Sequence, residues 1–432
     1  MGPTPGWAWM GAPSARRVVI VDPGHSSSSG HHAEVNSQLL AAGRSAGLAM
    51  EFWVDRDLNH DDPAFRPVFT DCGYGDPRHW LDLGGSLHIA RRLRQQLGAA
   101  TPGPEAEDPV DCWIAHSLLP FQLIGLAQLL QHQPAARLEV GILYAPAERL
   151  AESAQPATSE AALERQRQLA IGNARAAWSA LAQAVQAAGH QLRVGCSSEL
   201  QAALHQPLLA AAGLPPAVLQ PAVVGAGWQP RAGADGNPGG EEPLVLLHWG
   251  DLKPGKGRQE ALAVLEHLLA GGSVKRPPCR WLFHHCSSQL PDPAEQHLLQ
   301  RAAEQLPGFQ LWQGEVSAER MQAALAAVEV ALLPYCPSAY AERSSGVLWC
   351  YGAARLATGQ PARVVGHVQG WLAREARALG FHWEGLEASQ PSGPAWLAVL
   401  ERVLEEQPAA MFTAYGLKVL GRSYPRWLLA DL

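Results

Sequence analysis

The stretch that decides the fold passes from an apolar, strand-like segment, Val328-Glu-Val-Ala-Leu-Leu-Pro334, into the start of a helix, Ala339-Tyr-Ala-Glu-Arg-Ser-Ser-Gly-Val-Leu-Trp-Cys-Tyr-Gly-Ala-Ala354. A helix start offers unpaired backbone N–H groups and the positive end of the helix dipole. Ser344 and Ser345 add hydroxyl donors at this point, and Gly346 lets a ligand approach closely. Such a place is suited to a phosphate, which indicates a nucleotide-activated substrate.

The same alternation of strand and helix runs through both halves of the chain. The strand-like runs of the first half are residues 17–21, 50–54, 112–115, 140–144 and 192–195. Those of the second half are residues 244–249, 281–284, 309–312, 328–333 and 362–365. Helical patterns separate these runs, and we expect only helices from residue 366 to the end. The alternation predicts an α/β protein whose parallel sheets carry helices on both faces.

The length of 432 residues favours two domains, because one hydrophobic core rarely keeps growing to this size. The strongest linker signal is the Pro- and Gly-rich segment 226–242. We therefore expect a flexible leader over 1–16, a first domain over 17–225 and a second domain that begins at residue 243. Ligands of open α/β sheets bind beyond the carboxyl ends of the strands, so a cleft between the domains is expected to hold the chemistry.

Charge and composition exclude several classes of protein. The net charge of −7 and the presence of only four lysines argue against nucleic-acid binding, which needs clustered cations. Seven cysteines without a CxxC spacing favour a reducing compartment, and we expect a cytoplasmic protein. The sequence has no signal-peptide pattern and no apolar run of the roughly 18 residues that a spanning helix needs. Peripheral contact with a membrane stays open.

A second loop adds positive charge to the expected phosphate site. His248-Trp-Gly-Asp-Leu-Lys-Pro-Gly-Lys-Gly257 places Lys253 and Lys256 between a strand and a helix start, where lysines can neutralise a diphosphate leaving group. At this point the second half resembles the retaining GT-B glycosyltransferases of the family 4, or group 1, type. Their C-terminal domain opens with a strand, G-R-L-x-x-x-K-G and a helix, and the residues that match are Gly250, Leu252, Lys256 and Gly257.

The resemblance continues along the second half. Residues 309–316 are similar to the family's strand-plus-glycine segment, and the loop before the signature helix is similar to its E-x7-E element. By this resemblance Glu342 contacts hydroxyls of the donor sugar, while Ser345 and Gly346 meet the phosphates. The sequence departs from the family at Asp251, where the family has Arg, and at Cys350, where it has the second Glu that holds the ribose.

The resemblance also assigns residues in the first half. Gly24, His25, Gly30 and His31 occupy the place of an acceptor-side loop after the first strand. His116 follows the strand at 112–115, where family members often carry a histidine near the donor sugar.

The resemblance implies a GT-B fold of two Rossmann-like domains, with parallel sheets that face each other across a cleft. The second domain then covers 243–405, and a C-terminal helix within 406–432 packs back toward the first domain. The implied reaction moves a sugar from a nucleotide-sugar donor to a small-molecule, lipid-linked or glycan acceptor, with retention of configuration. The candidate catalytic residues are Glu342, His116 and Lys256. The candidate phosphate-binding residues are Gly250, Lys253, Lys256, Ser344, Ser345 and Gly346. Neither a metal nor another cofactor is expected, because cationic side chains and helix ends stabilise the leaving group in this family.

Two other functions stay open at this stage. A non-catalytic relative that binds nucleotide-sugars would explain the departures at Asp251 and Cys350. A zinc N-acetylmuramoyl-alanine amidase is suggested by His25, Glu34 and His88, which resemble its metal ligands. The pattern of residues 86–97 predicts a helix, however, where that enzyme needs a strand. His284-His-Cys286 also contains metal-ligand types, but neighbouring residues of a strand point to opposite faces, so we expect one buried histidine and one solvated.

Overall fold

The computed structural model describes residues 16–28, 30–70, 83–101, 109–146, 160–223, 242–253, 255–272, 279–286, 291–387, 392–406, 412–430 and 432. Apart from residues 16 and 242, the expected leader and linker lie outside these ranges.

Seven parallel strands form the first sheet, in the order β3-β2-β1-β4-β5-β6-β7. The strands are β1 (Arg17–Asp22), β2 (Ala49–Asp55), β3 (Phe65–Phe69), β4 (Cys112–Ala115), β5 (Arg137–Ile142), β6 (Gln191–Cys196) and β7 (Val218–Leu219). Strand β1 pairs with β2 on one side and with β4 on the other, so the strand order reverses between β1 and β4.

The second sheet has six parallel strands in the order β10-β9-β8-β11-β12-β13. The strands are β8 (Leu244–His248), β9 (Arg280–His285), β10 (Phe309–Gln313), β11 (Val328–Leu333), β12 (Arg363–His367) and β13 (His382–Leu386). Here the order reverses between β8 and β11, because β8 pairs with both β9 and β11. Both sheets therefore have the doubly wound arrangement that the alternation of the sequence predicts.

Helices cover both faces of both sheets. Those of the first half are α1 (Gly30–Ser45), α3 (Leu83–Ala100), α4 (Pro120–Leu130), α6 (Glu160–Ala188) and α7 (Glu199–Ala211). Those of the second half are α8 (Arg258–Leu269), α9 (Pro293–Gln305), α10 (Ala318–Ala327), α11 (Gly346–Ala357), α12 (Trp371–Leu379), α13 (Gly393–Glu405), α14 (Ala414–Leu420) and α15 (Tyr424–Leu429). No helix in the described ranges is long and apolar enough to cross a membrane.

The alternation of side chains along β1 explains why its run is entirely apolar. Val18 and Ile20 pack with α1 and α15 on one face, while Val19 and Val21 pack with α3, α4 and α6 on the other. The core on the α1 face continues without a break into the second half, under α10, α11, α12 and α14. The two sheets thus share one buried apolar cluster, to which α1 and α15 contribute together with α10 and α11.

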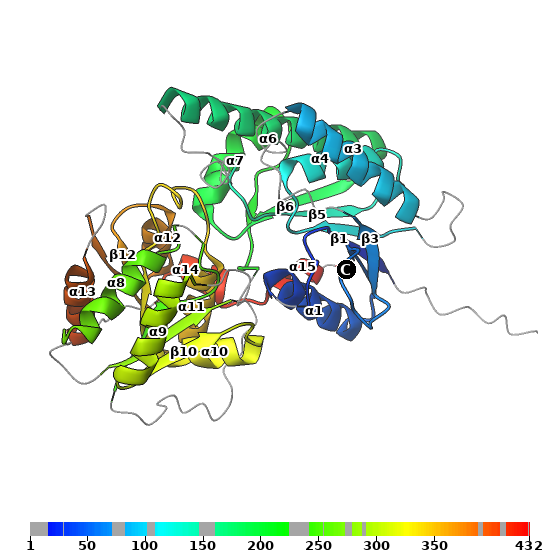
Figure 1. The fold of residues 1–432 in the computed structure, drawn as a ribbon. Helices are drawn as coiled ribbons and strands as arrows, with labels where there is room; N and C mark the ends of the chain where they lie inside the picture. Colours follow the sequence, from blue (N-terminus) through cyan, green and yellow to red (C-terminus); the bar gives the residue numbers. More distant parts are fainter. Residues whose placement is uncertain are drawn as a thin grey trace, which may run out of the picture.

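The last helix of the chain, α15, lies beside the first helix, α1. Helix α15, red in Figure 1, lies against α1, blue, although nearly the whole chain separates them. Arg193 on β6 contributes to this contact, since its guanidinium lies 4.1 Å from the ring centroid of Trp427 and donates to the carbonyl of Leu428. A second connection is the hydrogen bond of 2.8 Å from the N–H of Ala222 to the carbonyl of Val419.

Three strands were not expected from the sequence. Strands β3 and β7 fell in segments without a strand assignment, and β13 lies where only helices were expected, which was wrong. All three lie at a sheet edge, where one side of the strand has no neighbour. Edge strands tolerate proline, glycine and charge, such as Pro67 in β3 and Gly385 in β13, so they lack the apolar run that marks a central strand.

Candidate functional site

A buried polar network lies at the carboxyl ends of β1 and β4, where the order of the first sheet reverses. Its centre is Asp22, which is 0% exposed. The Asp22 carboxylate accepts hydrogen bonds from Ser117 Oγ at 3.0 Å, from Asn36 Nδ2 at 2.8 Å and from the N–H of Gly24 at 3.2 Å. His32 Nδ1 lies 2.9 Å from the same carboxylate. Ligands of open α/β sheets bind at such a reversal, so the network marks the first-domain side of a candidate site.

The partners of Asp22 keep its carboxylate ionised. Burial alone would raise the pKa of this carboxyl, but the charges and hydrogen bonds of His32, His116 and Asn36 outweigh burial and hold the pKa well below its usual range. Burial lowers the pKa values of His25 and His116 to about 4, although Asp22 acts in the opposite direction. At neutral pH the carboxylate of Asp22 is therefore ionised, and the imidazoles of His25 and His116 are neutral.

The structure places the five first-half candidates differently relative to this network. His25 and His116 are buried, Gly24 donates to Asp22, and His31 lies on the exposed side of α1. Gly30, the first residue of α1, has a φ of +86°, which favours glycine, and a Cβ there would meet no atom within 4 Å. Gly30 is thus required by its backbone conformation.

The lysine loop of the second half is shaped by three glycines with positive φ. Gly250, Gly255 and Gly257 have φ values of +96°, +83° and +75°, so the chain turns sharply before α8 begins. The turn brings Lys256 Nζ to within 3.4 Å of the position that a Cβ on Gly250 would take. Lys253 pairs with Asp251 at 3.0 Å.

The surroundings of Lys256 weaken its charge. Burial lowers the pKa of Lys256 to about 8, the charges of Lys253 and Arg343 act in the same direction, and Asp251 acts against them. A bound anion would reverse this effect, because it favours the charged ammonium group.

The loop before α11 meets the lysine loop. The N–H of Cys336 donates to the carbonyl of Gly255 at 2.8 Å, which joins the two loops directly. Helix α11 begins at Gly346, as expected, and Ser345 caps it by accepting a hydrogen bond from the N–H of Leu348. The loop that leads to the positive end of α11 and the loop that carries Lys256 are therefore in direct contact.

Two candidates of this loop are bonded to the first domain. Ser344 Oγ donates to the carbonyl of Leu143 at 3.4 Å. Glu342 forms an ion pair with Arg167 on α6, across 175 residues of sequence. Both contacts tie the α11 loop to the first half of the chain.

A cavity of about 670 Å³ lies between the halves. Helix α1 contributes His31 and Glu34, the β10–α10 region contributes Glu315 and Met321, and α11 contributes Gly346 and Cys350. The cavity thus has an apolar part, several carboxylates, and the N-terminus of α11 at its wall. Its volume falls in the range of sites for small molecules.

A second cavity, of about 800 Å³, lies at the opposite edge of the first sheet. It is lined by Arg137, Glu139 and Arg193, but the buried carboxylate of Glu139 is already paired with both arginines. This cavity lies at the amino ends of the strands. Since ligands of open α/β sheets bind at the carboxyl ends, we assign the candidate site to the cavity between the halves.

His284, at the end of β9, is a structural support. His284 Nδ1 accepts a hydrogen bond from the N–H of Gly250 at 3.2 Å, so its Nε2 carries the proton and donates to the carbonyl of Gly314 at 2.9 Å. This ring holds the lysine loop against the end of β10. The expectation that only one of the pair is buried was wrong, because helices cover both faces of the sheet and His285 is buried too.

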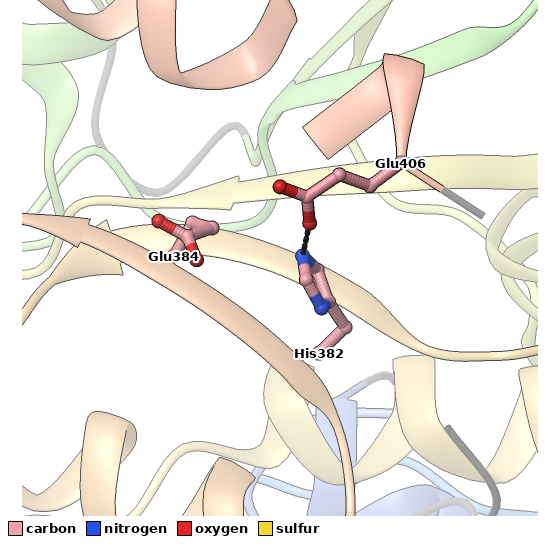
Figure 2. Close-up of side chains that lie close together, drawn as sticks. All are labelled: His382, Glu384 and Glu406. Atoms are coloured by element: carbon pink, nitrogen blue, oxygen red, sulfur yellow. Dashed lines mark ion pairs between the residues drawn. The ribbon is translucent and has the colours of Figure 1, made fainter. Parts of the chain in front are cut away.

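One group of metal-ligand types in the described residues lies apart from the cleft. His382 Nε2 and Glu406 Oε2 face each other at 3.0 Å, with Glu384 beside them (Figure 2). His382 and Glu384 belong to the edge strand β13, and Glu384 lies 3.9 Å from Arg402. These contacts are sufficient to explain the group as surface ion pairs.

The ligands of the amidase alternative are not brought together. Residues 86–97 are helical within α3, and His88 is exposed there. Helix α3 covers one face of the first sheet, while α1, which carries Glu34, covers the other. A sheet therefore separates two of the three residues that would have to bind one zinc ion.

Asp22, Asn36 and Ser117 were not among the candidates from the sequence. Asp22 ends a β-branched run directly before Pro-Gly, and His32 and Asn36 are four residues apart on one helix. That spacing places two side chains on the same face of a helix and is the signal that could have pointed to a shared partner.

No protein-family model matches the chain, and no curated protein matches it in sequence. Its structure, with two Rossmann-like domains whose parallel sheets have seven and six strands, has the GT-B fold. Among solved structures it is similar to an α,α-trehalose-phosphate synthase (UDP-forming) from Burkholderia xenovorans in complex with glucose-6-phosphate, with a TM-score of 0.57 and 13% identity over 96% of this chain and 98% of that chain.

Two further solved structures are similar in the same way. One is α,α-trehalose 6-phosphate synthase from Burkholderia multivorans, with a TM-score of 0.55 and 13% identity over 91% of both chains. The other is an E. coli trehalose-6-phosphate protein bound with UDP-2-fluoro glucose, with a TM-score of 0.52 and 14% identity over 90% of this chain and 92% of that chain. At this level of identity, the likeness establishes the fold.

Proposed function

We propose that the protein transfers a glycosyl unit from a nucleotide-sugar donor to an acceptor in the cleft between its two sheets. One observation carries this function: the N-terminus of α11 lies at the wall of a 670 Å³ cavity that α1 closes from the other domain, and the loop before α11 is hydrogen-bonded to the lysine loop through Cys336 and Gly255. This arrangement offers cations and a helix end to a diphosphate, and beside them a cavity for the rest of a nucleotide.

The residues have distinct roles in this proposal. Lys253 and Lys256 neutralise the departing diphosphate, with Gly250 allowing close approach, and Ser344, Ser345 and Gly346 hold the phosphates. Glu342 positions the donor sugar, and His116 stands on the side of the reacting carbon. The loop around Gly24, His25, Gly30 and His31 admits a small-molecule, lipid-linked or glycan acceptor. Retention of configuration is proposed from the resemblance to retaining enzymes.

Leaving-group stabilisation needs no metal or other cofactor in this scheme, because two lysines and a helix N-terminus supply the positive charge. The fold supports a uridine nucleotide as the first donor to test, since the similar solved structures include UDP-forming synthases. A cytoplasmic location agrees with the six cysteines in the described residues, which are all free thiols.

A non-catalytic nucleotide-sugar-binding protein is the second candidate. The observation that favours it is the ion pair between Asp251 and Lys253, which partly neutralises one of the two loop cations. Cys350, at the place of the family's ribose-binding glutamate, is a buried thiol whose pKa is raised well above its usual value by burial.

Donor-dependent thermal stabilisation tests the proposal, since a ligand that binds only the folded state raises the melting temperature. The purified protein is compared with Lys256→Ala, Glu342→Ala and the matched control Lys418→Ala, which removes an exposed lysine of α14. We expect one nucleotide-sugar to stabilise the wild type and the control but not the other two variants. Turnover of that donor then separates the transferase from the binding protein. Absence of stabilisation by any nucleotide-sugar would overturn both functions.

A further inference from the structure

Asn36 connects three side chains at the carboxyl ends of β1 and β4. Its amide group is 0% exposed and lies within hydrogen-bond distance of Asp22, His25 and His116. The amide has one acceptor oxygen and one donor nitrogen with two protons, so its orientation decides which partner receives a proton.

Asp22 fixes that orientation. An ionised carboxylate can only accept, and the Asn36 amide atom that lies 2.8 Å from Asp22 Oδ2 must therefore be the nitrogen. Turning the amide over would place two oxygens together in a site without water contact, which leaves both unsatisfied. The ring of His32 and the hydroxyl of Ser117 complete the shell of donors around Asp22.

The protons of both histidines follow from the orientation of the amide. The second N–H of Asn36 points to His25 Nδ1 at 2.9 Å, so this nitrogen accepts and the proton of the neutral ring is on Nε2. Asn36 Oδ1 lies 2.9 Å from His116 Nε2, so that nitrogen must donate and His116 Nδ1 carries no proton. One amide thus selects one tautomer for each of two rings.

His116 has no place for a second proton. Its Nδ1 is buried and has no hydrogen-bond partner among the described residues, so a proton there would be a buried donor without an acceptor. Leaving such a donor unpaired costs about 1–3 kcal/mol, which opposes protonation of the ring. The depressed pKa values of both histidines agree with this geometry.

We propose that Asn36 is a positioning residue that keeps two imidazoles on the first-domain side of the cleft uncharged, by holding His25 and His116 as neutral Nε2–H tautomers with His116 Nδ1 as a bare acceptor. Five histidines lie in this region, namely His25, His31, His32, His60 and His116, and protonation would place positive charge where a neutral sugar and a hydroxyl nucleophile have to bind. The assignment of the tautomers depends only on the hydrogen-bond geometry, whereas the consequence for activity rests on the proposed function.

Other ionisable groups face the two rings. His25 is close to His60 in the β2–β3 loop, to His32 on α1 and to the end of β2, where the N–H of Asp55 donates to its carbonyl. His116 faces Asp22 and the ring of Tyr424 on α15, with ring centroids 6.4 Å apart. His31 stands on the cavity side of α1, within electrostatic reach of Lys253. Among these groups, Asp22 is the anion that contacts Asn36 directly, and its carboxylate fixes the orientation of the Asn36 amide.

Nitrogen NMR of the protein labelled with ¹⁵N-histidine tests the tautomers in the wild type. Signals are assigned by their loss in His25→Gln and His116→Gln. We expect both rings to show a protonated Nε2 and a bare Nδ1 from about pH 5 to about pH 8, against an unperturbed histidine that titrates near 6.5. His190 is an internal reference, because its Nδ1 accepts from the N–H of Ala136 and its Nε2 donates to the carbonyl of Leu130. A proton on His116 Nδ1, averaging between tautomers, or titration above pH 5 would overturn the proposal.

Asn36→Asp tests the role of the amide. A carboxylate in its place favours the charged rings, so we expect at least one of the two histidines to titrate between pH 6 and pH 8, as a nearby opposite charge raises a histidine pKa. Below that midpoint, turnover should fall by about tenfold per pH unit, while the wild type stays flat over the same range. Asn173→Asp makes the same change at another buried asparagine, on α6, and should leave the tautomers of both rings unchanged.

The outcomes separate the two proposals. Unchanged histidine signals in folded Asn36→Asp would reject the role of Asn36. Fixed tautomers in a wild type that binds no nucleotide-sugar would reject the proposed function and leave the tautomer assignment in place.

Discussion

Ser198 Oγ donates a hydrogen bond of 3.0 Å to Glu375 Oε2, and the two residues belong to different domains. Ser198 caps α7 in the first domain, and Glu375 is a fully buried residue of α12 in the second. Tyr415 and Trp349 donate to the other carboxylate oxygen at 2.7 and 3.3 Å. The interface between the domains therefore contains a buried carboxylate held by three donors.

The stability of the protein should depend on the protonation of Glu375. Burial raises the pKa of Glu375 from 4.5 to about 7, although its three donors act against burial. Because the pKa is raised in the folded state, the contribution of Glu375 to the free energy of unfolding is fully present below about pH 4.5. This contribution is lost as pH rises through 7, and the loss is about 3 kcal/mol for a shift of this size. Glu375→Gln cannot ionise, so its melting temperature should rise relative to the wild type between pH 5 and pH 8. Parallel pH curves for the two proteins would contradict this expectation.

Donor binding should weaken in alkaline solution because of Lys256. Its pKa of about 8 in the free protein means that the ammonium group loses its charge above that pH. Since a diphosphate binds the charged form, we expect the Kd for the donor to increase by up to about tenfold per pH unit above 8. Lys256→Ala should remove this dependence and reduce turnover by a factor of about ten to a thousand, whereas Lys418→Ala should keep both. Calorimetric titration from pH 7 to pH 9.5 measures the dependence.

The lysine loop should tolerate no side chain at Gly257. A Cβ at this position would lie 2.5 Å from Pro334 Cγ and 2.9 Å from the Pro334 carbonyl oxygen, in addition to the strain of a φ of +75°. Gly271, after α8, has a similar φ of +89°, but a Cβ there would meet no atom within 4 Å, so this position isolates the backbone strain of about 1–2 kcal/mol. We expect Gly257→Ala to lower the melting temperature more than Gly271→Ala does. We also expect donor binding to be lost only in Gly257→Ala, because its loop carries Lys256.

The ion pair between Arg167 and Glu342 should affect the Kd for the donor more than it affects the stability of the protein. The two side chains are 46% and 20% exposed, and exposed ion pairs contribute less than about 1 kcal/mol. Arg167→Ala should therefore leave the melting temperature nearly unchanged. Its donor Kd should decrease by up to about fivefold, because Glu342 no longer has to leave its partner before it contacts the sugar. An unchanged Kd, together with donor binding that survives in Glu342→Gln, would remove Glu342 from the donor site.

Sequence patterns were sufficient for the central strands and for most helices. Helix α8 lies between the strand-like runs 244–249 and 281–284, where a helical pattern was expected, and it begins directly after Gly257. The strands β1, β8 and β11 were found for a related reason, since a strand covered on both faces is a continuous apolar run. The edge strands β3, β7 and β13 gave no such signal and were missed for that reason, whereas the edge strand β10 was predicted from residues 309–312.

The candidate site was predictable only where its residues are close in sequence. The glycines and lysines of residues 250–257 and the helix start at Gly346 could be found because a turn and a helix start are local structures. The partners of those residues could not be found, since Arg167 and Glu342 are 175 residues apart and neither has an unusual sequence context.

The sequence by itself determined two doubly wound parallel sheets, two glycine-bounded loops and the positive charge at one of them. These features could be predicted because turn geometry and apolar periodicity depend on residues that are close in sequence. Tertiary structure alone decided that Asn36 bridges Asp22 and His116, that Glu342 binds Arg167, and that Glu375 is buried between the domains. The physical reason is that proton positions and charge states depend on the desolvation and the partners of each group, and those exist only once distant segments have packed together.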